Sequence, residues 1–91
     1  MPYIDSESRS RLDPKINCLI KQLQQPDDVS MVAGELNYVV TRLILAMWRT
    51  KKNYYTGNAI VGMLECAKAE FYRQHLAPYE DGKLKQNGDV S

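Results

Sequence analysis

The sequence predicts an all-α protein, a small bundle of about three helices in which long second and third helices run antiparallel. Apolar residues recur at helical spacing in three segments, and each segment follows a candidate capping residue. No segment alternates apolar and polar residues as a strand would. With 91 residues, of which 44% are hydrophobic and 25% charged, the chain is predicted to form a single domain, 1–91.

The first helix is predicted for residues 13–24, after an extended arm at 1–12. The arm mixes charges and serines without a sustained period. Asp13 is a suitable N-cap, and Pro14 then takes the first helical position, where its missing N–H has no cost. The apolar residues that follow at helical spacing are Ile16, Leu19, Ile20 and Leu23.

The second helix is predicted for residues 28–50, with Asp28 or Ser30 as its N-cap. Between Leu36 and Trp48 it is apolar almost all the way round, and such a helix must be covered on every side. Because two partner helices of one small chain cover only part of it, the pattern predicts that the chain self-associates.

The third helix is predicted for residues 54–77, capped by Asn53 or Thr56. Pro78 should end or kink it, because proline disrupts the interior of a helix. A polar tail is expected at 78–91, which has room for one last short helical turn at 79–85.

Charge, cysteine usage and hydropathy indicate a cytoplasmic protein. A net charge of +1 argues against general nucleic-acid binding. In the cytosol Cys18 and Cys66 should be reduced, and one histidine is too few for an ordinary zinc site. The longest uninterrupted apolar run, 43–48, is far shorter than the ~20 residues that span a bilayer, so no membrane partner is expected.

Four blocks of the sequence resemble a family of short uncharacterised proteins that occur in bacteria and in tailed bacteriophages. The blocks are Met1-Pro2-Tyr3-Ile4; Gly34-Glu35-Leu36-Asn37-Tyr38 followed by Thr41-Arg42-Leu43; Leu64-Glu65-Cys66-Ala67-Lys68 with Glu70-Phe71-Tyr72-Arg73; and Ala77-Pro78-Tyr79-Glu80-Asp81 with Lys83 and Asn87-Gly88-Asp89-Val90. The resemblance covers nearly the whole chain. It implies a cytosolic accessory protein of a phage or bacterium, and it implies no reaction.

The candidate binding residues are polar side chains that interrupt the apolar second helix. Asn37 and Thr41 share one face at i, i+4, and Tyr38 and Arg42 share the adjacent face. In one interpretation Arg42 is buried and pairs with a carboxylate of the third helix. In the other, the four residues line a pocket at a subunit boundary, with Tyr38 or Tyr55 as a stacking surface for an anionic ligand.

These observations favour a non-enzymatic, homo-oligomeric binding module that captures a small anionic, nucleotide-type ligand or engages a host protein. A basic and aromatic run supports the nucleotide-type ligand because it pairs cations with stacking surfaces. Its members are Arg49, Lys51, Lys52, Tyr54 and Tyr55.

Two alternatives remain. One is a small metal-dependent phosphohydrolase whose Mg²⁺ would be held by Glu35, Glu65, Glu70 or the acids of the tail. The other is a structural adaptor without a ligand. No catalytic residue, metal ligand or cofactor is assigned from the sequence.

Overall fold

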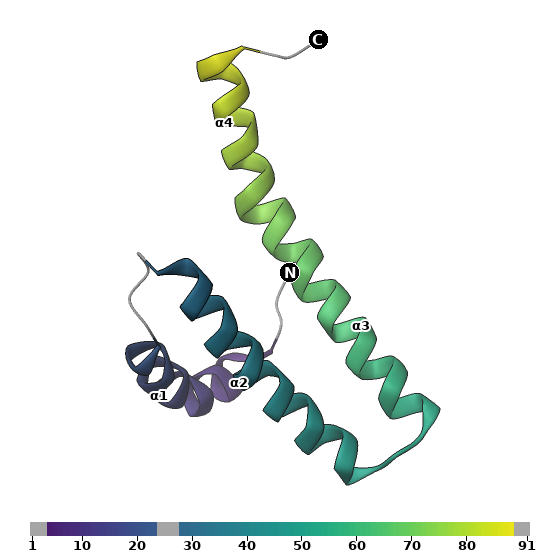
Figure 1. Cartoon of the computed structure of the whole chain (residues 1–91). Helices are drawn as coiled ribbons and strands as arrows, with labels where there is room; N and C mark the ends of the chain where they lie inside the picture. Colours follow the sequence, from purple (N-terminus) through teal and green to yellow (C-terminus); the bar gives the residue numbers. More distant parts are fainter. Residues whose placement is uncertain (1–3, 24–27, 89–91) are drawn as a thin grey trace. The chain divides into compact units, whose positions relative to one another are not determined.

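The computed structural model describes residues 4–23 and 28–88, which are 90% helical and contain no strand (Figure 1). The predicted all-α class is therefore confirmed, with three helical segments. The chain divides into two compact units, residues 1–43 and 44–91, and the division falls inside the second segment. The single domain expected from the chain length stays a prediction.

Helix α1 spans Ser6–Gln22, so the prediction of an extended arm up to residue 12 is wrong. The helix begins at an earlier cap, Asp5, whose carboxylate accepts a hydrogen bond of 2.8 Å from the backbone N–H of Ser8. Serine, glutamate and arginine then continue the helix without an apolar period, because a solvated helical turn does not require one. Pro14 consequently lies inside the helix rather than at its first position.

Helix α2 spans Val29–Thr50, close to the predicted 28–50. The Asp28 carboxylate accepts a hydrogen bond of 3.3 Å from the N–H of Met31, as expected of an N-cap. No residue of α2 is buried.

By length and composition alone, α2 is long and apolar enough to cross a membrane. The prediction of no membrane partner considered only the uninterrupted apolar run at 43–48. Mean hydropathy over the longer helix, with its few charged residues, gives a different result. Core helices of soluble proteins and signal sequences satisfy the same criterion.

In the second unit, helix α3 spans Tyr54–Phe71 and is continued by a π-helical turn, η1, at Tyr72–Leu76 and by helix α4 at Ala77–Asn87 (Figure 1). Of the two predicted effects of Pro78, an end of the helix is therefore wrong, and the predicted tail with room for one short helical turn at 79–85 is instead a helix of 11 residues.

The π turn supplies the physical reason for this continuation. A proline at position 78 cannot donate to the carbonyl four residues before it, and its ring crowds that carbonyl in an α-helix. The N–H of Ala77 instead donates to the carbonyl of Tyr72, five residues back. The wider turn lets the helical path continue past the proline. Gly88, at a φ of 84°, ends α4, and its N–H donates to the carbonyl of Leu84 at 2.8 Å.

Burial within the second unit is greatest close to the corner where α2 ends and α3 begins. Among the described residues only Thr56 and Ile60 are buried. Leu64 and Phe71 continue the face of Ile60 at i+4 and i+11 and are exposed. The corner, rather than the length of the helix, is thus the packed part of this unit.

Candidate functional site

The predicted polar residues of α2 form two pairs within the helix. The hydroxyl of Thr41 donates to the side-chain carbonyl of Asn37 at 3.1 Å. The guanidinium of Arg42 donates to the hydroxyl of Tyr38 at 2.9 Å and lies 5.7 Å from the centre of its ring. Both pairs are i, i+4 neighbours, so the helix itself brings them together.

Within the first unit Arg42 is not buried. Its pairing with a carboxylate of the third helix, which lies in the other unit, stays a prediction. Arg42 is exposed, and its recorded partner is a tyrosine one turn earlier on its own helix. An exposed guanidinium keeps its hydration by water and needs no buried counter-charge. Tyr55, the fifth predicted binding residue, lies in the second unit, and the other four lie in the first.

A groove of about 530 Å³ lies between α1 and α2 within the first unit, next to the Arg42 pair. Its walls are mostly apolar, and Tyr38 forms part of them. The lining residues are Leu19, Gln22, Leu23, Ser30, Met31, Gly34, Glu35, Tyr38 and Val39. The face of Tyr38 that the guanidinium covers is therefore part of a larger, otherwise apolar surface.

The corner between α2 and α3 holds a second hollow, of about 230 Å³, lined by Trp48, Asn53, Tyr54, Gly57 and Asn58. We refer to it as the corner hollow. A Cβ atom added to Gly57 would lie 3.7 Å from Cζ3 of Trp48, so the indole rests against the backbone of α3. At this distance a Cβ would make an ordinary van der Waals contact with the indole, so the packing of Trp48 does not depend on glycine at this position.

The first turn of α3, which lines the corner hollow opposite Trp48, is stabilised by its N-cap. The side-chain carbonyl of Asn53 accepts a hydrogen bond of 2.8 Å from the N–H of Thr56, and its backbone carbonyl accepts one of 3.0 Å from Gly57. This cap starts the helix at Tyr54. Tyr54 and Tyr55 are 91% and 83% exposed.

Three cations lie in the sequence between Trp48 and Asn53, two of the residues that line the corner hollow. Arg49 is in the last turn of α2, and Lys51 and Lys52 are in the connection of three residues between α2 and α3. All three are exposed, and none has a carboxylate partner in the part of the chain that the structure describes. By contrast, Lys68 lies 3.5 Å from Glu65 in an ion pair. The corner therefore combines aromatic surface with uncompensated positive charge.

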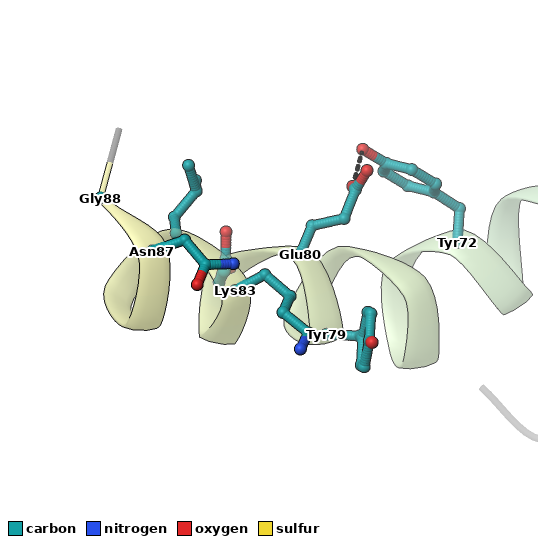
Figure 2. A pocket seen from close by; sticks show the side chains of 8 residues that line it. Tyr72, Tyr79, Glu80, Lys83, Asn87 and Gly88 are labelled. Atoms are coloured by element: carbon teal, nitrogen blue, oxygen red, sulfur yellow. Dashed lines mark hydrogen bonds between the residues drawn. The ribbon is translucent and has the colours of Figure 1, made fainter. Parts of the chain in front are cut away.

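The surface of α4 and the π turn is shown in Figure 2. The hydroxyl of Tyr72 donates to the carboxylate of Glu80 at 3.0 Å, and the ammonium of Lys83 lies 5.6 Å from the ring centre of Tyr79. The hydrogen bond and the negative charge of Glu80 raise the pKa of the Tyr72 phenol above its ordinary value. Glu80, one of the acidic residues of the predicted tail, is thus already paired with Tyr72, which lies on the same continuous helix.

A metal site was considered for the glutamates and the acids of the tail. Within residues 4–23 and 28–88, no three histidine, cysteine, aspartate or glutamate side chains converge as ligands. Asp89 lies outside the described residues.

Sequence reasoning named the aromatic and basic run but selected only Tyr55 from it as a binding residue. Trp48 was assigned to the apolar surface of the second helix, because its side chain belongs to that pattern.

Residues 1–90 match a protein family described as a domain of unknown function (DUF6899). The chain belongs to this family. No curated protein and no solved structure matches the chain. Membership agrees with the resemblance to an uncharacterised family of short proteins, whereas the occurrence in phages stays a prediction.

Proposed function

We propose that this DUF6899 protein is a non-enzymatic, homo-oligomeric binding module that captures a small anionic, nucleotide-type ligand. The binding place in this proposal is the corner hollow, rather than the Arg42 pair on α2. The observation that carries it is an aromatic hollow, lined by Trp48 and Tyr54, with three cations adjacent to its lining residues in the sequence that have no carboxylate partner among the described residues.

Each part of the corner matches one part of such a ligand. A base has two π faces, and tryptophan and tyrosine rings stack on them with little dependence on base identity. Phosphate oxygens are acceptors for lysine and arginine, and these charge-assisted hydrogen bonds are stronger than neutral ones. With a net charge of +1 the chain has no broad basic field, so a compact ligand is favoured over a long nucleic acid.

The Arg42 pair is a weaker candidate for the same role. Its guanidinium already donates to Tyr38 and covers the ring that would stack on a base. A ligand would have to displace both contacts before it used either group. The cations at the corner require no such displacement.

Tryptophan fluorescence gives a direct test, because Trp48 is the single tryptophan of the chain. We would titrate the protein with mononucleotides, cyclic dinucleotides and short single-stranded oligonucleotides. The expected result is saturable quenching of Trp48 by at least one mononucleotide or cyclic dinucleotide. In the Lys51→Ala/Lys52→Ala variant the affinity should fall by roughly tenfold or more, which corresponds to ~1.4 kcal/mol.

The matched control is Lys83→Ala/Lys85→Ala, which removes two exposed lysines from α4 and should leave the affinity within about twofold. Absence of quenching across the panel, with the oligomer intact, would favour the ligand-free adaptor or the host-protein partner. Release of product from a nucleotide, abolished by a chelator, would favour the metal-dependent phosphohydrolase.

A further inference from the structure

An apolar stripe runs along α2 within the first unit. Its members are Val29, Ala33, Leu36, Val40 and Leu43, and we call them the α2 stripe. Their spacings of four, three, four and three residues are those of a heptad repeat, which keeps side chains on one line of a helix. None of them lines the groove between α1 and α2, so the α2 stripe is a separate face of the helix.

Most of the α2 stripe is open to solvent, and Val40 is half-buried. Val29 is 71% exposed, Leu36 47% and Leu43 66%. Single exposed apolar residues are common, but a contiguous line of them on a regular helix marks an interaction surface.

We propose that the α2 stripe packs in parallel and in register against the same stripe of a second copy of this chain. The inference rests on the self-association in the proposed function, and it adds the surface and the orientation. It is independent of the corner hollow and its ligand.

The distribution of charge on α2 favours a second copy as the occupant. In a parallel, in-register pair each residue lies near its own counterpart, so any charge on the stripe would repel itself. The stripe and its flanking residues Val32, Asn37 and Val39 carry none. The charged residues of α2 are Glu35, Arg42 and Arg49, which are spaced by seven and lie on a different line of the helix.

The side-chain types of the stripe favour two parallel strands. The spacing puts Val40 and Ala33 at the a positions of the heptad and Leu36 and Leu43 at the d positions. In parallel coiled coils, a β-branched residue at a with leucine at d favours two strands over three or four, and Val40 with Leu36 and Leu43 follows this pattern.

A lipid bilayer is the other surface that could cover an apolar helix of this length. It fits α2 less well, because Glu35 and Arg42 lie within the span and would enter the hydrocarbon region. In a helix pair the same two residues remain in water, on a line of the helix away from the contact.

Disulfide trapping tests the inference. The free and exposed Cys18 and Cys66 are first changed to serine. In that background, Leu36→Cys places a thiol at the centre of the stripe and Leu43→Cys one at its end. In a parallel pair both thiols come within the Cα separation that a disulfide needs, whereas in an antiparallel pair only that of Leu36 does. The matched control is Thr41→Cys, an exposed position on another face of the same helix.

Under mild oxidation we expect Leu36→Cys to give about tenfold more disulfide-linked dimer than Thr41→Cys. Light scattering of the wild-type chain should give a multiple of 10.4 kDa, and Leu43→Lys should lower that mass. Equal cross-linking of Leu36→Cys and Thr41→Cys would overturn the inference, and so would cross-linking of Leu36→Cys without cross-linking of Leu43→Cys, which indicates an antiparallel pair.

The failures of the two proposals are distinguishable. An oligomer by mass that Leu36→Cys does not cross-link would refute the α2 stripe and leave self-association through another surface. A wild-type mass of one chain would refute both self-association and the stripe. Flotation of the wild-type chain with phosphatidylcholine vesicles, lost in Leu43→Lys, would assign the stripe to a lipid surface and overturn the inference.

Discussion

Replacing Asn53 with alanine should destabilise the corner between α2 and α3. Asn53 is the N-cap of α3, and its side chain satisfies the N–H of Thr56 at 2.8 Å. Loss of an N-cap costs ~0.5–2 kcal/mol. Thr56 is buried, so water reaches its N–H poorly and the cost should lie in the upper half of that range, about 1–2 kcal/mol. For a domain of this size the melting temperature should fall by roughly 5–15 °C.

The assay is thermal unfolding followed by circular dichroism at one protein concentration, because an oligomer melts at a temperature that depends on concentration. Asn53→Asp keeps an acceptor at the cap and should melt close to the wild type. Asn58→Ala removes another asparagine of α3 that is exposed and should not lower the melting temperature, since alanine favours the helix. The reasoning is refuted if Asn53→Ala and Asn58→Ala melt at the same temperature.

Two further predictions follow from α1 and α2. Hydrogen bonds from Ser8 hold the pKa of the Asp5 carboxyl below its ordinary 3.8. The cap should therefore stabilise α1 above pH 3.8, and this stabilisation should be lost as the pH falls further. Asp5→Asn should reduce the acid dependence of helicity, measured by circular dichroism. Because Arg42 is exposed, Arg42→Ala and Arg49→Ala should melt within about 4 °C of one another, and a much larger loss for Arg42→Ala would show that it has a buried role.

The sequence predicted which residue types could form the candidate site, but not how they are arranged. Sequence spacing showed that Tyr38 and Arg42 share a helix face, and the structure confirms that they touch. Spacing could not show whether that face is covered, because burial depends on what packs against a helix and not on the helix itself. The corner hollow depends on Trp48 and Asn58, which are ten residues apart and become neighbours only through the turn at 51–53.

The sequence by itself determined the all-α class and limited the starts of α2 and α3 to two candidate caps each, because a capping side chain acts on N–H groups only two or three residues away; the structure shows Asp28 and Asn53 as the caps. The same local rule also allowed a second start for α1, and the choice of Asp5 over Asp13 was visible only in the structure. The continuation of α3 into α4 past Pro78 likewise depended on a shift of the hydrogen-bond pattern in the preceding turn. Local propensity predicts that a proline inside a helix is destabilising. Whether a π turn before the proline avoids its clash with the preceding carbonyl is decided only by the backbone conformation of the folded chain.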